Sequence, residues 1–157
     1  MKKGWPLWLL VGVLAALHFF LHLTLGLDGA APDLLTVAVL LGVRPLSGGA
    51  AAGLGFGLGL LEDATSLGAF GAAAVADTVV GYLGARSRDL FVGESGFFLA
   101  LYLFLGAWVQ DALYYGFAEV VRRGDPVRAL LVQAPLGALY AAAAGLVAVA
   151  LVRSMTR

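Results

Sequence analysis

The sequence predicts an all-α integral membrane protein with six transmembrane helices in a single domain, residues 1–157. Of its 157 residues, 61% are hydrophobic and only 13% are charged, and the mean hydropathy is +0.93. Average soluble domains carry about 45–50% apolar and about 25% charged residues. The chain therefore has too few polar side chains to cover a water-soluble globule, and no polar domain interrupts its apolar segments.

Charge and cysteine content exclude several classes of function. The formal net charge is zero and no basic block stands out, so a nucleic-acid partner has no electrostatic support. The chain has no cysteine, which excludes disulfides, thiolate chemistry and Cys-ligated metals. No Ser/His/Asp or Cys/His pattern argues for hydrolysis, and no His-Glu-x-x-His motif argues for a metalloprotease. We expect no enzymatic activity and no cofactor.

The apolar segments divide into predicted spans at approximately residues 5–25, 34–45, 48–61, 67–85, 97–117 and 127–152. The first segment is longer than the apolar core of a signal peptide, about 7–15 residues, so we predict an uncleaved span behind Lys2 and Lys3. Asp33 is expected to cap the second helix by accepting backbone N–H groups. Arg44-Pro45 separates the second helix from the third, because the residue before a proline is pushed out of the helical conformation.

The second and third segments are shorter than the roughly 20 residues that a perpendicular helix needs, so one kinked span is the alternative. The positive-inside rule separates the two topologies. Six spans put seven Lys and Arg residues in the cytoplasm and three outside, whereas five spans give five against four and strand Arg44 in lipid. We therefore predict six spans and cytoplasmic termini, with Asp28, Asp33, Glu62 and Asp63 on the outer side.

Small residues in the third span predict close helix packing. Gly53/Gly57 and Gly55/Gly59 are pairs four residues apart, and such positions share one helix face. In lipid, small residues mark helix contacts because they let backbones approach. We expect the third and fourth spans to form a tight pair. The glycine spacing fits neither the dinucleotide-binding fingerprint nor the phosphate-binding loop.

Glu62 and Asp63 lie together between the third and fourth spans and allow two interpretations. In the first, Ser66 or Asp63 caps the fourth helix in a tight turn. In the second, the acids anchor a basic or amide group of a partner.

Ionisable residues within spans are costly and are functional candidates by default. His18 and His22 share one face of the first span, Asp77 lies in the fourth, and Gln110 and Asp111 lie in the fifth. They predict a cluster of buried interhelical hydrogen bonds, a cavity for a partner or ligand, or a proton or cation pathway. Two histidines do not make a metal site, which normally needs three or four ligands, so no metal is expected.

One segment resembles a known family. Gly55-Phe56-x-x-Gly59-Leu60-x-x-Asp63, followed by Ser66-Leu67-Gly68, is similar to a motif of the rod shape-determining protein MreD family. Pro32-Asp33-Leu34-Leu35 resembles that family's entry into its second span. The likeness is specific over about residues 32–84 and generic over the last two spans.

The resemblance implies a non-enzymatic scaffold in the inner membrane of rod-shaped bacteria, within the elongasome that carries out lateral peptidoglycan synthesis. It implies binding to the membrane helix and periplasmic stem of MreC. It also implies that the protein acts together with MreB, RodA and its class B penicillin-binding protein. Homodimerisation is a further expectation. Candidate partner contacts in the fifth span are Phe97, Tyr102, Trp108 and Tyr114, with lipid-facing or interfacial positions as the alternative.

The resemblance also implies a fold like the S components of energy-coupling-factor vitamin transporters. These proteins hold a vitamin in a cavity on the periplasmic side. The alternative function is therefore a small-molecule binding subunit of an uptake transporter. Ala141–Ala144 and the small residues of the third span would then dock its membrane partner.

Overall fold

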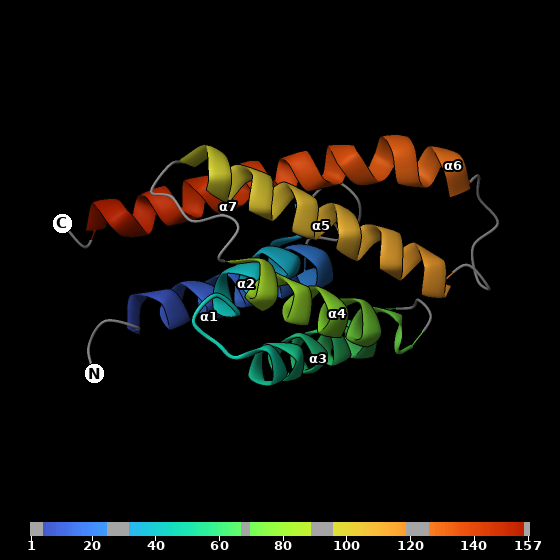
Figure 1. Ribbon diagram of the computed structural model, residues 1–157, viewed down its shortest axis with the longest axis horizontal. Coiled ribbons are helices and arrows are strands. Elements are labelled where there is room, and N and C mark those ends of the chain that lie inside the picture. The colour runs from blue at the N-terminus through green and yellow to red at the C-terminus, as the bar shows by residue number, and fades with distance from the viewer. Residues whose placement is uncertain (1–4, 25–31, 67–69, 89–95, 119–125, 156–157) are drawn as a thin grey trace.

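The computed structural model describes residues 5–24, 32–66, 70–88, 96–118 and 126–155, and the regular structure in these ranges is entirely helical. The elements are α1 (Trp5–Phe19), the π-helical η1 (Phe20–Thr24), α2 (Leu34–Gly42), α3 (Gly48–Thr65), α4 (Ala72–Ser87), α5 (Gly96–Ala118), α6 (Pro126–Arg128), the π-helical η3 (Ala129–Gln133) and α7 (Ala134–Met155). Because η1 continues α1 and η3 joins α6 to α7, the described residues form six helices (Figure 1).

The predicted all-α class is confirmed, and three helices have the length and apolarity needed to cross a membrane. They cover Trp5–Leu23, Gly96–Phe117 and Ala129–Ser154. The other three helices are shorter: α2 has 9 residues, α3 has 18 and α4 has 16. The second predicted span thus ends earlier than expected, at Gly42 rather than residue 45.

α2 lies at the centre of the molecule. All nine of its residues are buried, and it packs against α1, α3, α4, α5 and α7. A helix that is apolar on every side requires such enclosure. The main core joins Leu41 and its neighbours on α2 to Leu14 of α1, Leu103 of α5 and Ala141 of α7.

Both ends of α2 are capped by side chains. The carboxylate of Asp33 accepts the backbone N–H groups of Leu35 at 3.1 Å and Thr36 at 3.0 Å, which confirms the predicted cap. At the other end, the hydroxyl of Tyr102 on α5 donates to the backbone oxygen of Leu40 at 2.9 Å. The last four carbonyls of a helix have no partner within it, so Tyr102 satisfies one of them.

α3 and α4 pack backbone to backbone. Gly55 lies against the backbone oxygen of Asp77, and Gly59 lies against the backbone of Ala73 and its neighbour on α4. Gly81 of α4 faces the backbone oxygen of Ala51 in the same way. A Cβ atom added at Gly59 would lie 2.5 Å from the backbone oxygen of Ala73, so only glycine fits there.

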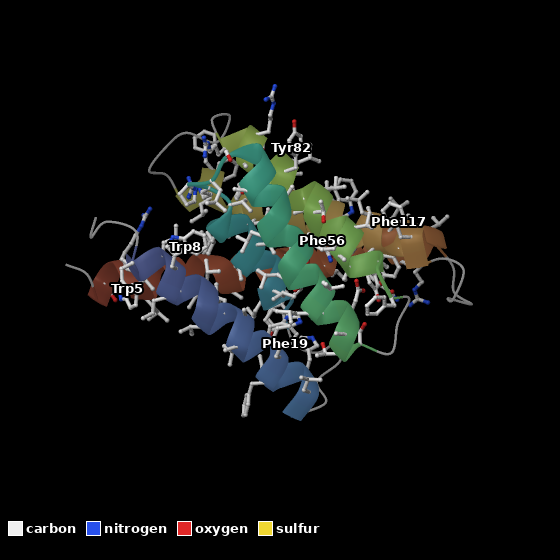
Figure 2. The ribbon with its side chains drawn as sticks, turned by 90° about the horizontal axis from the view of Figure 1, so that it is seen from below. Trp5, Trp8, Phe19, Phe56, Tyr82 and Phe117 are labelled. Atoms are coloured by element: carbon white, nitrogen blue, oxygen red, sulfur yellow. The ribbon has the colours of Figure 1, made fainter. Side chains whose placement is uncertain are left out.

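The charged residues that the structure describes are unevenly distributed along the long axis of the molecule. α1 begins and α7 ends at the same end, where the described arginines Arg44, Arg86, Arg88 and Arg153 follow or close helices (Figures 1 and 2). Arg88 stabilises this end, since its Nη1 donates to the backbone oxygens of Arg44 at 2.6 Å and Leu46 at 2.9 Å. The start of α2 and the end of α3, which carry the acids Asp33, Glu62 and Asp63, lie at the opposite end, together with Arg128 of α6.

Candidate functional site

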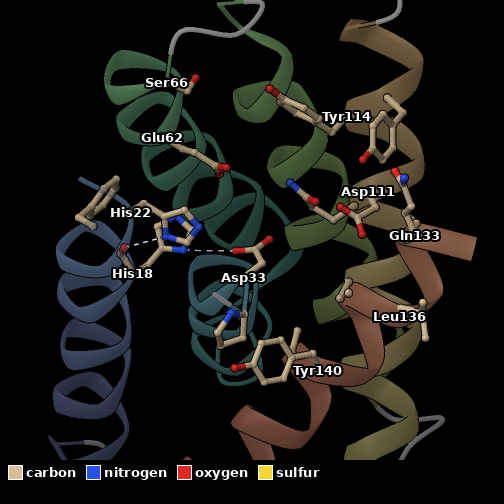
Figure 3. A pocket seen from close by; sticks show the side chains of 18 of the residues that line it. His18, His22, Asp33, Glu62, Ser66, Asp111, Tyr114, Gln133, Leu136 and Tyr140 are labelled. Atoms are coloured by element: carbon tan, nitrogen blue, oxygen red, sulfur yellow. Dashed lines mark hydrogen bonds and ion pairs between the residues drawn. The ribbon is translucent and has the colours of Figure 1, made fainter. Parts of the chain in front are cut away.

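A cavity of about 1050 Å³ opens at the acidic end of the molecule, between helices distant in sequence (Figure 3). It is bounded by the end of α1 with η1, the start of α2, the end of α3, α5, η3 and the start of α7. Its polar lining residues are His18, His22, Asp33, Glu62, Thr65, Ser66, Gln110, Asp111, Tyr114, Tyr115, Gln133 and Tyr140.

The two histidines form a stacked pair on one wall. Their ring centroids are 4.2 Å apart with an interplanar angle of 22°, and Nδ1–H of His22 donates to the backbone oxygen of His18 at 2.9 Å. The backbone N–H of Leu35 donates to Nδ1 of His18 at 3.3 Å. The same N–H lies closer to Oδ1 of Asp33, at 3.1 Å, and Nδ1 of His18 is 3.6 Å from that oxygen.

Three carboxyl groups enter the cavity from three elements. Asp33 caps α2, and its second carboxylate oxygen also accepts a hydrogen bond from the hydroxyl of Thr36. Asp111 projects from α5 (Figure 3). Oε2 of Glu62 is buried and has no hydrogen-bond partner among the described residues. The described lining thus holds three carboxyl groups and two histidines but no Lys or Arg.

Glu62 and Asp63 are adjacent in the sequence but have different roles. Asp63 is 2% exposed, and its two carboxylate oxygens accept the backbone N–H groups of Ala73 at 3.0 Å and Ala74 at 2.8 Å. It thus caps α4 from the end of α3. The hydroxyl of Ser66 instead lies 3.5 Å from the backbone oxygen of Asp63. Of the two caps that the sequence leaves open, Asp63 is the one observed, and Glu62 is the acid that faces the cavity.

The family-like motif divides between the two faces of α3. Gly55, Gly59 and Asp63 are buried against α4, whereas Phe56 is 50% exposed and Leu60 is 37% exposed on the other side (Figure 2). Leu67 and Gly68 lie outside the described residues.

Four of the five residues predicted as an intramembrane polar cluster share the cavity: His18, His22, Gln110 and Asp111. Asp77 does not line the cavity. It is 0% exposed, and both carboxyl oxygens lack a hydrogen-bond partner within the described part of the chain. The side chain of Gln110 on α5, which lines the cavity, lies beside this carboxyl group.

The aromatic residues of α5, predicted as partner contacts, occupy different environments. Tyr102 is 4% exposed and belongs to the core, because its hydroxyl caps α2; this corrects its assignment to a partner-facing surface. Trp108 is half-buried, and its Nε1–H donates to the backbone oxygen of Leu130 in η3 at 3.1 Å. Tyr114 lines the cavity, and Phe97 is 70% exposed.

Sequence reasoning missed Tyr115, Gln133 and Tyr140 as lining residues. Gln133 could have been predicted from the sequence, because it is the one amide side chain within the apolar segment 127–152. The π-helical turns are a second feature of this end, because η1 supplies His22 and η3 supplies Gln133. π-helical turns within α-helices are frequent at functional sites.

Comparison of the chain with protein-family models, curated proteins and solved structures gives no match. No group of three or more His, Asp or Glu within the described ranges is arranged to hold a metal ion. We therefore infer function from the motif, the cavity and the distribution of charge.

Proposed function

We propose that this protein is a non-enzymatic membrane scaffold of the MreD type, which binds MreC and supports lateral peptidoglycan synthesis and rod shape in bacteria. The observation that carries the proposal is the construction of the family-like motif. Gly55, Gly59 and Asp63 bring the backbones of α3 and α4 together and cap the second helix. Three residues of the motif thus have defined roles in packing and capping, which supports the resemblance.

The scaffold crosses the bacterial cytoplasmic membrane six times, with both termini in the cytoplasm. The arginine-rich end then faces the cytoplasm, in accord with the positive-inside rule. The acidic cavity faces the periplasm, where the stem of MreC lies. α3 has 18 residues, which at 1.5 Å per residue gives about 27 Å, close to the roughly 30 Å hydrocarbon core. α2 needs no such length because protein encloses it.

The membrane helix of MreC packs on the outer face of α3, defined here as Gly49, Gly53, Phe56 and Gly57. A Cβ atom at any of these three glycines would meet no atom within 4 Å among the described residues. Exposed glycines weaken a helix by about 0.5–1 kcal/mol each relative to alanine, so internal packing does not account for this row. Close approach of a second helix accounts for these exposed glycines, and Phe56 lies beside the contact. MreB, RodA and its class B penicillin-binding protein assemble around this pair.

Co-purification tests the scaffold. Affinity-tagged protein, extracted from its native membrane in mild detergent, is expected to retain an MreC-like protein with one membrane helix. The double variant Gly53→Leu/Gly57→Leu is expected to co-purify with at least tenfold less of this partner while remaining monodisperse. Gly12→Leu is the matched control, because Gly12 is likewise an open glycine, on α1.

Failure of the unmodified protein to retain MreC would refute the scaffold. Equal losses in the α3 variant and the α1 control would refute the outer face of α3 as the contact.

The cavity favours a second candidate function, a solute-binding subunit of an uptake transporter. Its volume of about 1050 Å³ suits a small molecule. This function predicts co-purification with an ATPase module and its coupling subunit in place of MreC.

A further inference from the structure

We propose that Asp77 of α4 is a proton-binding site, whose carboxyl group holds a proton at neutral pH and exchanges it with the cavity by way of Gln110. The proton is the ligand, and the site lies inside one of the predicted spans. This inference goes beyond the scaffold and rests neither on MreC nor on a solute in the cavity.

The carboxyl group of Asp77 lies in the interior of the molecule, where α4 packs against α2, α3 and α5. Asp77 is 0% exposed, and Gly55 of α3 lies against its backbone oxygen. Among the described carboxyl groups, only that of Asp77 has both oxygens buried without a hydrogen-bond partner. Buried polar groups are nearly always paired, so this exception calls for a physical explanation. Ionisable residues inside a membrane are functional candidates for the same reason.

No positive charge among the described residues compensates this carboxyl group. The charged groups that interact with it are Asp33 at the start of α2 and Glu62 and Asp63 near the end of α3, and all three are acids. From α5 it meets the neutral amide of Gln110. An unpaired carboxylate in an apolar interior is so costly that the group takes up a proton instead. The proton also gives Asp77 an O–H donor, and the amide of Gln110 has an oxygen that can accept it.

Gln110 links this carboxyl group to the cavity. It is 3% exposed, lies beside the carboxyl group of Asp77 and lines the cavity, whereas Asp77 does not line it. In the exchange, the O–H bond of Asp77 breaks, its proton passes to water in the cavity, and the carboxylate takes a proton back from that water. The amide of Gln110 offers a donor and an acceptor on this path, and an apolar side chain of similar size would offer neither.

Infrared spectroscopy of the purified full chain tests whether Asp77 holds a proton. The carbonyl band of a carboxylic acid is separate from the bands of a carboxylate, and a detergent without carbonyl groups keeps this region free of lipid esters. With an isotope label in the side-chain carboxyl groups of aspartate, we expect an acid band at neutral pH that shifts with the label. The label separates aspartate from Glu62. Absence of such a band in the unmodified protein would overturn the proposal.

Two neutral variants of similar size assign the band to one residue. Asp77→Asn is expected to remove it. Asp111→Asn, at a half-buried lining position on α5, is the matched control and is expected to retain it. The melting temperature of each variant checks its fold. Persistence of the full band in Asp77→Asn would overturn the proposal.

Hydrogen–deuterium exchange of the same band tests the path through Gln110. Transfer to heavy water shifts the acid band, and the rate of this shift measures the exchange. We expect Gln110→Met, which keeps the length of the side chain and removes its amide, to slow the exchange at least tenfold. Gln133→Met is the matched control, because Gln133 lines the cavity but is exposed on η3. Unchanged exchange in Gln110→Met, or equal slowing in both variants, would contradict the proposal.

Discussion

The carboxylate of Asp63, near the end of α3, accepts the backbone N–H of Ala74 on α4 at 2.8 Å. The other carboxylate oxygen accepts the N–H of Ala73 at 3.0 Å. These N–H groups belong to the first turn of α4, where a helix has no internal partner for them. One side chain therefore closes the turn between two helices and satisfies the buried start of the second.

Replacing Asp63 is expected to destabilise the protein through this cap. Asp63→Ala leaves two buried N–H groups unpaired and lowers the free energy of unfolding by about 1–3 kcal/mol. Thermal unfolding in detergent measures the effect as a lower melting temperature. Ser66→Ala is the control, since its hydroxyl makes only a 3.5 Å contact with the backbone oxygen of Asp63. Equal melting temperatures for both variants would refute the cap.

The glycines of α3 differ in their tolerance of a methyl group. Gly59→Ala places a Cβ atom 2.5 Å from the backbone oxygen of Ala73 and 2.7 Å from Cα of Ala74, so α3 and α4 must separate. We expect a loss of about 1–3 kcal/mol. Gly57→Ala meets open space and is expected to be neutral or to stabilise by up to about 1 kcal/mol.

Melting temperatures of the isolated protein separate these two variants. The opposite order, with Gly57→Ala the more damaging, would mean that α3 presents its other face to α4.

Tyr102 is expected to stabilise the central helix through its hydroxyl. Tyr102→Phe removes the 2.9 Å hydrogen bond to the backbone oxygen of Leu40 and lowers the free energy of unfolding by about 1 kcal/mol. Tyr82→Phe is the matched control, because Tyr82 is 44% exposed on α4. A drop in melting temperature of the same size in both variants would contradict the role of the hydroxyl.

Local features of the fold follow from the sequence. The Asp33 cap is read from an acid placed directly before an apolar run, because both bonds lie within three residues. The separation of α2 from α3 follows from Arg44-Pro45 for the same local reason.

Features that depend on helix orientation do not follow from the sequence. Two rows of glycines on α3 are visible there, but only packing shows that Gly55 and Gly59 face α4 while Gly53 and Gly57 face outward. Nothing in the sequence distinguishes Tyr102 from other aromatic residues of apolar segments, because its hydrogen bond to α2 depends on how α5 packs.

The cavity is the feature furthest from local sequence. Glu62, Asp111 and Gln133 come from helices far apart in the chain, and their convergence depends on how those helices lean and rotate. Sequence reasoning could identify ionisable and amide residues within apolar segments. It could not determine which of them share the cavity: Asp77 is buried outside it, beside Gln110, which lines it.

We propose that even the short helices cross the membrane and carry the acidic cavity to the outer side. Cysteine labelling across α3 tests it most directly, because the chain has no native cysteine. Ser47 and Ser66 flank α3, and both are exposed. With a membrane-impermeant maleimide on spheroplasts, Ser66→Cys is expected to react at once, and Ser47→Cys only after permeabilisation. Reaction of both positions from the same side would show that α3 does not cross, and would contradict the account.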